Sequence, residues 1–233
     1  MSAPDAVAVP PVRATPGRVP RFTRAQRVSH WVNATLWGVA LITAAYFKFG
    51  WGQSLVHDRE LVRNVHVIFG LGIIAAFAVS VMGRYGAALR QDLRRFNRWS
   101  PDDVRWMRTL GKSGNAKLGK FNPGQKLNAI FVGATALILG ATGSIMKWNK
   151  PFSTDLRTGA DFVHGWFALF ITITIVGHIM FALRDRESLG SMVSGDVSTT
   201  WANHHRPIWA AEVTREPVVT PDGNAREPEQ LDA

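Results

Sequence analysis

The stretch that decides the fold reads FVHGWFALFITITIVGHIMF, residues 162–181. It contains no Asp, Glu, Lys or Arg, and about 20 residues at about 1.5 Å per helical residue cross the roughly 30 Å hydrocarbon core of a bilayer. Two histidines, His164 and His178, nevertheless lie within it. Because a polar group in hydrocarbon is costly unless it has a partner, the stretch predicts a membrane helix whose histidines have a function.

Three further stretches have a similar length and almost no charge. The first, VSHWVNATLWGVALITAAYF, begins too late and is too long for the apolar region of a cleavable signal peptide, so we expect it to stay in the membrane. With the opening stretch extended to both sides, the predicted spans are residues 28–47, 64–83, 127–146 and 160–183. We therefore predict an all-α membrane protein, a bundle of four transmembrane helices.

The two ends of the chain differ in composition from the spans. Residues 1–20 are rich in Pro, Ala and Val without periodicity, and we predict that they form a disordered tail. We expect the folded domain to cover residues 21–212 and a second disordered tail to cover residues 213–233.

The net charge of +10 is distributed unevenly along the chain. Four spans place both termini on one side, where the N-terminal segment, residues 84–126 and the C-terminal segment hold 5, 11 and 5 Lys and Arg residues, against 3 in each loop on the other side. This excess predicts a multi-pass protein of the cytoplasmic (inner) membrane with both termini cytoplasmic. Basic loops between apolar spans indicate a lipid bilayer as partner, and no nucleic acid.

The chain contains no cysteine. Disulfides, thiolate-held iron–sulfur clusters and the C-x-x-C-H attachment of c-type haem are therefore excluded. Any redox cofactor in this chain would need other ligands.

The long basic segment between the second and third spans contains a predicted helix within WSPDDVRWMRTLG, residues 99–111. It carries an N-cap, a proline at the first position, a first turn with two acidic residues and a closing glycine, at Ser100, Pro101, Asp102, Asp103 and Gly111. Val104, Met107 and Leu110 share one face, which favours a short interfacial helix, with a solvated helix docked on a partner as the alternative. The Gly- and Asn-rich residues 112–126 that follow are typical of a loop.

Four of the seven histidines lie within spans, and their depths sort them into pairs. His57, in an external loop, and His204 and His205, in the C-terminal segment, are expected to be solvated. His30 and His178 fall near the cytoplasmic face, and His66 and His164 near the outer face. The prediction is therefore one pair near the cytoplasmic face, His30 and His178, and one pair near the outer face, His66 and His164.

The spacing of His164 and His178 predicts two stacked sites. Fourteen residues turn the helix to within roughly 40° of the starting direction and advance it by about 21 Å, so both rings face the same way at different depths. Two neutral imidazoles from different helices suit bis-histidine ligation of haem iron. Zinc would want four ligands, and a proton relay would not require two matched pairs, although both remain alternatives.

Small residues recur at helical spacing along the third span, which has no histidine: Ala129, Gly133, Ala136, Gly140 and Gly143. Gly70 and Gly165 lie close to histidines on the second and fourth spans. A stripe that makes room for a flat porphyrin and ordinary small-residue helix packing explain this pattern equally well.

The segments around these residues resemble a known family. RVSHW (27–31), RNVHVIFG (63–70), GKFNPGQK (119–126), GDVSTTWANHHRPIW (195–209) and the two histidine segments of the last span are similar to the cytochrome b556-type gamma subunits of membrane-bound formate dehydrogenases. The resemblance covers roughly residues 20–212. The histidine framework is shared with di-haem cytochrome b subunits of nickel–iron hydrogenases, and the N-x-G-Q-K turn favours the formate dehydrogenase branch.

The resemblance implies a membrane-anchor subunit that serves anaerobic respiration. Such a subunit would bind two haem b groups and use them to transfer electrons. Electrons would come from a molybdenum or tungsten catalytic (alpha) subunit and pass through an iron–sulfur (beta) subunit. They would then cross the membrane through the two haems and reduce a quinone, either menaquinone or ubiquinone, near the cytoplasmic face. The chain would thus hold the quinone-reduction site but not the formate site, in a complex expected to form a higher oligomer.

By resemblance, His66 and His164 would hold the outer haem, and His30 and His178 the inner one. The quinone would bind near the inner haem, at Asn122, Gly124, Gln125 and His178, although Pro123 stiffens this turn and a purely structural turn is the alternative. The other functions left open are a di-haem subunit of a nickel–iron hydrogenase or another quinone-linked oxidoreductase, and a haem-free membrane adaptor or transporter.

Overall fold

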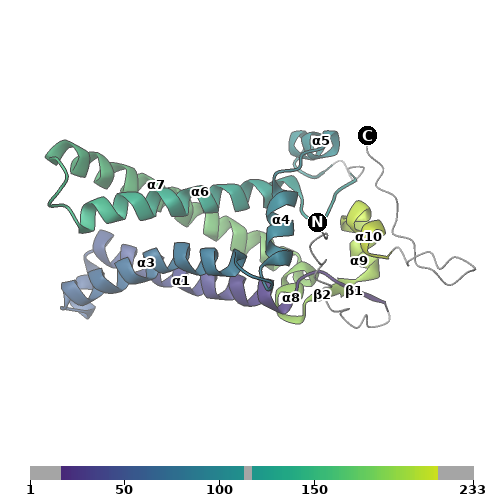
Figure 1. Cartoon of the computed structure of the whole chain (residues 1–233), viewed down its shortest axis with the longest axis horizontal. Coiled ribbons are helices and arrows are strands. Elements are labelled where there is room, and N and C mark those ends of the chain that lie inside the picture. Colours follow the sequence, from purple (N-terminus) through teal and green to yellow (C-terminus); the bar gives the residue numbers. More distant parts are fainter. Residues whose placement is uncertain (1–16, 113–116, 215–233) are drawn as a thin grey trace, which may run out of the picture.

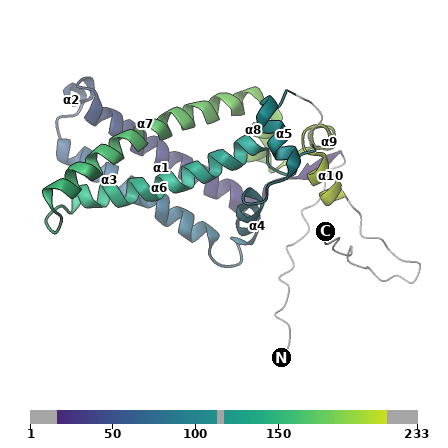
Figure 2. The same cartoon turned by 90° about the horizontal axis from the view of Figure 1, so that it is seen from above.

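Four long helices form the body of the computed structural model, which describes residues 17–112 and 117–214 (Figure 1). They are α1 (Arg24–Lys48), α3 (Arg59–Val81), α6 (Pro123–Lys147) and α7 (Thr154–Arg184). The helix α1 packs on α3, α3 on α6, α6 on α7, and α7 on α1, which closes a four-helix bundle. The views in Figures 1 and 2 show the four helices running side by side along the long axis.

The helices α3, α6 and α7 are each long and apolar enough to cross a membrane, by length and composition. Many of their large apolar side chains point outward, as a lipid-facing surface requires: Ile68, Val79, Leu137, Phe162, Ile173 and Phe181 are all more than half exposed. The prediction of an all-α fold is confirmed, and these three helices have the length and composition of membrane spans. The helix α1 matches the others in length but is more polar, so its crossing of the membrane stays a prediction.

Each of these three helices begins several residues before its predicted span. The reason is a polar N-cap on the N-terminal side of the apolar run, whose side-chain oxygen accepts a hydrogen bond from a backbone N–H of the first turn. Asp58 caps α3, Asn122 caps α6 and Ser153 caps α7. Apolar composition therefore marks the membrane-facing part of each helix, and the cap marks its start.

The core of the bundle lies halfway along its length. Trp37 and Ala40 of α1, Ile73 of α3 and Ile171 of α7 are buried together, and Ile171 is fully enclosed. Partly buried apolar side chains of α1, α6 and α7 pack around them: Leu36, Leu41, Phe131, Val132, Ala136, Leu139 and Ile175. This packing fills the space between the helices with apolar atoms at mid-depth.

The short elements gather at one end of the bundle, which we call the cap (Figure 1). The cap consists of α4 (Ala87–Phe96), α5 (Pro101–Thr109), α8 (Arg186–Ser194), α9 (Thr199–His205), α10 (Pro207–Thr214), β1 (Arg18–Pro20) and β2 (Asp196–Ser198). The opposite end, which we call the far end, holds α2 (Trp51–Leu55) and the link between α6 and α7. The predicted helix within residues 99–111 is α5, with the predicted capping by Ser100.

One detail of the central segment differs from prediction. A second helix, α4, precedes α5 in a segment that was expected to hold one. On α5 the Asp103 side chain is buried, and Val104 and Leu110 of the expected apolar face are exposed, which is compatible with a helix whose apolar face meets the membrane interface. The burial of Asp103 follows from an ion pair with Lys126, whose ammonium lies 2.8 Å from the carboxylate.

A second buried ion pair fastens α4 to the rest of the molecule. The Lys120 ammonium donates to both carboxylate oxygens of Asp92 at 2.8 and 2.7 Å, and the Gln26 amide of α1 donates to the same carboxylate at 2.5 Å. Burial raises the pKa of Asp92 and lowers that of Lys120, because each charge loses water, and the attraction between the two opposes both shifts. The pair thus joins α4, the start of α1 and the segment before α6.

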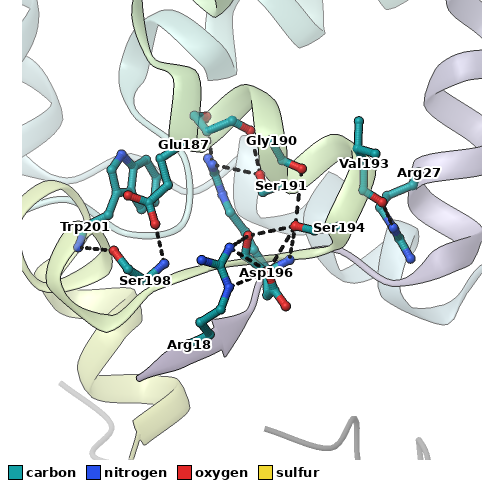
Figure 3. Close-up of polar contacts among 12 residues, drawn as sticks. Arg18, Arg27, Glu187, Gly190, Ser191, Val193, Ser194, Asp196, Ser198 and Trp201 are labelled. Carbon is teal, nitrogen blue, oxygen red and sulfur yellow. Dashed lines mark hydrogen bonds and ion pairs between the residues drawn. The ribbon is translucent and has the colours of Figure 1, made fainter. Parts of the chain in front are cut away.

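The strands β1 and β2 tie the two ends of the described chain together (Figure 3). They are antiparallel, and the Arg18 guanidinium donates to the Asp196 carboxylate at 2.8 Å. This hydrogen bond lowers the pKa of Asp196. Behind the strands lies a second apolar cluster of Val19, Val197, Trp201, Ala202, Trp209 and Ala210.

The structure can be compared with the predicted boundaries of the folded domain at both of its ends. The strand β1 lies within residues 1–20, which were predicted to form a disordered tail, so the folded part begins before residue 21. The helix α10 ends at Thr214, close to the predicted boundary at 212. The remainder of both predicted tails, residues 1–16 and 215–233, lies outside the described residues.

Replacing Asp92 by Ala should lower the free energy of unfolding by about 3–5 kcal/mol, because it leaves the Lys120 ammonium buried without its partner. The paired change Asp92→Leu with Lys120→Met should cost much less, since no buried charge is left. Removing the exposed Glu60 that pairs with Arg63 should change stability by about 0.5 kcal/mol or less. Denaturant titration in mild detergent measures all three, and equal losses for Asp92→Ala and Glu60→Ala would contradict the role of the buried pair.

Candidate functional site

The structure brings His30 and His178 together at the cap end of the bundle. His30 lies in the second turn of α1, and His178 lies near the end of α7. Their ring centroids are 6.3 Å apart and the ring planes differ by 58°. The indole of Trp31 lies edge-on to His30 at 5.3 Å, so an aromatic side chain flanks this pair.

A second pair, His66 and His164, lies at the far end. His66 comes from α3 and His164 from the start of α7, and their ring centroids are 6.2 Å apart with planes at 65°. These are the two pairs that the depths of the spans predict. The helix α7 contributes one histidine to each, at positions separated by about 21 Å along its axis.

The apolar core of the bundle separates the two pairs. Ile171 lies midway between the two histidines of α7 and is fully buried, and Trp37 and Ile73 pack beside it. The molecule therefore holds two imidazole pairs, one toward each end, with a dry and densely packed layer between them.

Both histidines of the far pair have a hydrogen-bonding partner at one ring nitrogen. His66 Nδ1 lies 2.8 Å from the Thr43 hydroxyl and 3.1 Å from the carbonyl oxygen of Ala40. His164 Nδ1 lies 3.0 Å from the Thr142 hydroxyl. With Nδ1 engaged in this way, Nε2 of each ring is the nitrogen available to a ligand.

The spacing of the rings fits one metal atom between each pair. An imidazole nitrogen binds a metal at about 2 Å and lies about 1 Å from the centre of its ring, so two such ligands on opposite sides of one atom put their centroids about 6 Å apart. The measured separations are 6.3 and 6.2 Å. Bis-histidine ligation of haem iron therefore fits both pairs.

The geometry does not favour a metal ion held by protein ligands alone. Within residues 17–112 and 117–214, no group of three or more His, Asp or Glu side chains is placed to hold a metal ion. Each site offers two imidazoles, whereas a protein-bound zinc takes three or four protein ligands. A porphyrin, which supplies four nitrogens itself, needs no more than these two.

Two glycines of the small-residue stripe on α6 permit side chains of neighbouring helices to approach closely. At Gly140 an added Cβ would lie 2.4 Å from Ile74 of α3, so this glycine permits helix packing. At Gly143 an added Cβ would lie 3.2 Å from the His164 ring, so this glycine makes room for a histidine of the far pair. Gly70 and Gly165, each near a far-pair histidine, have no atom within 4 Å of such a Cβ.

The turn predicted to bind quinone forms the N-terminus of α6. The Asn122 side chain accepts from the Gln125 backbone N–H at 2.8 Å, and the Gln125 side chain accepts from the Asn122 backbone N–H at 3.0 Å. This reciprocal capping box supports the structural explanation of the turn. A Cβ at Gly124 would lie 3.3 Å from the Trp106 ring, so Gly124 permits α5 to pack against α6.

The turn has a cationic neighbour that the sequence did not indicate. The Arg206 guanidinium, in the link between α9 and α10, donates to the Gln125 side-chain oxygen at 3.3 Å. Burial lowers the pKa of Arg206 to about 10, and the group stays cationic at neutral pH. The structure thus brings Asn122, Gly124 and Gln125 together with Arg206, while among the described residues none of them hydrogen-bonds to His178, the fourth residue predicted to bind quinone.

The remaining histidines lie where they were expected. His57, His204 and His205 are exposed, and His205 lies beside the Trp201 ring at 5.2 Å. The residues that sequence reasoning missed are Thr43 and Thr142. Sorting hydroxyl side chains by depth, as was done for the histidines, would have placed both at the level of the far pair.

The chain is similar to several known proteins. The family model of the prokaryotic cytochrome b561 matches residues 21–195. The chain is 25% identical to the formate dehydrogenase cytochrome b556(fdo) subunit of Escherichia coli K12, over 84% of this chain and 93% of the relative. It is 27% identical to the formate dehydrogenase cytochrome b556 subunit of Haemophilus influenzae, over 84% and 83% of the two chains. The nitrate-inducible cytochrome b556(Fdn) subunit of Escherichia coli K12 is 23% identical over 81% and 88%.

Replacing Asn122 by Ala should lower the free energy of unfolding by about 1 kcal/mol, because α6 loses its N-cap acceptor. The Asn122→Asp variant keeps an acceptor oxygen and should be as stable as the parent. Thermal unfolding in detergent compares the two. Equal stability of the Ala variant and the parent would show that the capping box contributes nothing.

Proposed function

The chain belongs to the prokaryotic cytochrome b561 family, whose members are membrane cytochromes, and from this premise we propose that it is the membrane-anchor cytochrome b subunit of a formate dehydrogenase. The observation that carries the proposal is the stacking of two imidazole pairs at opposite ends of one bundle. The similarity to formate dehydrogenase cytochrome b556 subunits over more than four fifths of the chain names the complex.

The proposed fold in the membrane has four spanning helices. The helix α1 has 25 residues, contacts α3 along the bundle and carries no Asp, Glu, Lys or Arg between Arg27 and Lys48. This length and this charge-free interval suffice for a span. Since the basic residues are concentrated in the cap and at the chain termini, we place the cap on the cytoplasmic side of the inner membrane.

Family membership implies haem b, and the proposal assigns two such groups to the two pairs. His66 and His164 would hold the one at the far end, and His30 and His178 the one at the cap end. Bound haems would supply two one-electron carriers at different depths. The chain's own part is to present four neutral imidazole nitrogens, to exclude water with the core around Ile171, and to fix the spacing of the two sites along α7.

The proposed electron acceptor is a quinone bound beside the cap-end pair. Asn122, Gly124, Gln125 and His178 are the proposed contacts, and the amide N–H groups of Asn122 and Gln125 are the donors toward a quinone oxygen, because their oxygens serve the capping box. The Arg206 cation holds the Gln125 side chain in place. A site on the cytoplasmic side would take the protons for quinone reduction from the cytoplasm.

The proposed partners are the other subunits of the complex. An iron–sulfur (beta) subunit would meet the far end, where the outer haem lies, and a molybdenum or tungsten catalytic (alpha) subunit would deliver electrons to it. The chain itself would carry the quinone site and not the formate site. Outward-facing side chains at the far end that such a subunit would cover include Leu55 and Val56.

Haem content tests the proposal directly. The purified chain should contain two low-spin b-type haems, measured by the pyridine haemochrome and by reduced-minus-oxidised spectra. His178→Ala should lose one of them and His66→Ala the other, while His57→Ala, which changes an exposed histidine, should keep both. Retention of one haem in each variant also reports that the variant has folded.

A folded, haem-supplied preparation without haem would refute the proposed function. Two haems in His178→Ala would refute the assignment of the cap-end pair while leaving the family relationship intact.

The quinone assignment has its own test in the Asn122→Asp variant. It keeps the N-cap acceptor but loses the amide donor, so the reoxidation of the reduced protein by a soluble quinone analogue should slow by about tenfold, the effect of one lost hydrogen bond. Haem content and stability should not change. An unaltered reoxidation rate in stopped-flow measurements would assign Asn122 a structural role alone.

A further inference from the structure

The two histidines of the far pair are supported in the same way by two threonines. The Thr43 hydroxyl of α1 lies 2.8 Å from His66 Nδ1 of α3, and the Thr142 hydroxyl of α6 lies 3.0 Å from His164 Nδ1 of α7. In both cases the threonine lies on the helix that packs against the helix of its histidine. The arrangement is therefore repeated on opposite sides of one site.

The direction of each hydrogen bond follows from the other contacts of the hydroxyl. Thr43 O–H donates to the carbonyl of Val39 at 2.8 Å, and Thr142 O–H donates to the carbonyl of Ile138 at 2.7 Å. Since the proton of each hydroxyl is used on its own helix, the oxygen accepts from the ring. Both rings thus carry their proton on Nδ1, which leaves Nε2 bare.

The cap-end pair is built differently. Within the described residues, neither His30 nor His178 has a hydrogen-bonding partner at a ring nitrogen, and the near neighbour of His30 is the Trp31 ring. The two pairs have nearly the same ring separation, so they differ in the support of the imidazoles and not in their spacing.

We propose that Thr43 and Thr142 are positioning residues that orient the far-end histidines and give the haem bound there a lower reduction potential than the haem at the cap end. The proposal rests on the haem ligation proposed above. A ring N–H that donates to an oxygen makes the other nitrogen a stronger electron donor, which stabilises the oxidised metal. The cap-end pair lacks this support.

This difference sets a direction for electron transfer. With haems held by both pairs, a lower potential at the far end would make transfer of one electron to the cap end downhill, with the far-end group oxidised and the cap-end group reduced by the same electron. The threonines would thus bias flow toward the end at which the quinone is proposed to bind.

Valine is the substitution that isolates the hydroxyl, because it has nearly the same shape as threonine and cannot accept a hydrogen bond. Thr43→Val and Thr142→Val are compared with Thr172→Val, which removes an exposed hydroxyl of α7 that bonds only the carbonyl of Ala168. Thr43→Ser, which keeps a hydroxyl, serves as the rescue variant. Potentiometric titration of the visible spectrum gives the midpoint potential of each haem.

Each of the two far-end valine variants should raise the midpoint potential of the far-end haem and leave that of the cap-end haem unchanged. The expected rise is about tenfold in the reduction equilibrium, which is about 59 mV for one electron. The double variant should shift the same haem further, and Thr172→Val should shift neither. Loss of the far-end haem in Thr43→Val, with recovery of that haem in Thr43→Ser, would also support the role of the Thr43 hydroxyl in orienting His66.

Two results would overturn the inference. Two haems with unaltered potentials in both valine variants would refute the role of the threonines while leaving the proposed function in place. Parent protein without haem would refute the proposed function and the inference together.

Discussion

The cost of placing a polar side chain in an apolar bundle governs this structure. Each of the four histidines in the long helices lies opposite another, and no helix holds both members of a pair. Within a membrane such groups must find partners in neighbouring helices, because neither water nor lipid can serve them. The pairing brings α7 close to α1 at the cap end and to α3 at the far end, in addition to the packing of α1 on α3 and of α6 on α7.

In the cap, buried polar side chains find their partners as ion pairs. Asp92 with Lys120 and Asp103 with Lys126 are buried ion pairs whose members come from segments far apart along the chain. Each pair has further donors or acceptors, such as the Gln26 amide and the Arg98 carbonyl, which satisfy the remaining hydrogen-bonding groups. Such pairs contribute little net stability compared with apolar packing, but removing one member is costly, and so they fix how α4 and α5 dock.

Sequence reasoning succeeded where a signal was periodic or strong and failed where it depended on contacts between distant segments. The helix α5 was predicted because Ser100, Pro101 and Asp103 form a local start signal. Its neighbour α4 was missed because its N-cap residue, Gly86, has no side chain to cap the helix, and because its basic residues resemble a solvated loop. The role of Asn122 and Gln125 as a capping box could be seen in the spacing, but the approach of Arg206 could not.

The sequence by itself determined the apolar lengths of the long helices and the positions of His30, His66, His164 and His178 along them, since both follow from residue type and a rise of about 1.5 Å per residue. Only the tertiary structure decided which hydroxyls meet which rings. Thr43 and His66 are 23 residues apart, as Thr142 and His164 are 22, and their contact depends on the rotation of one helix against another. That rotation is set by the packing of whole helix faces, which no local pattern encodes.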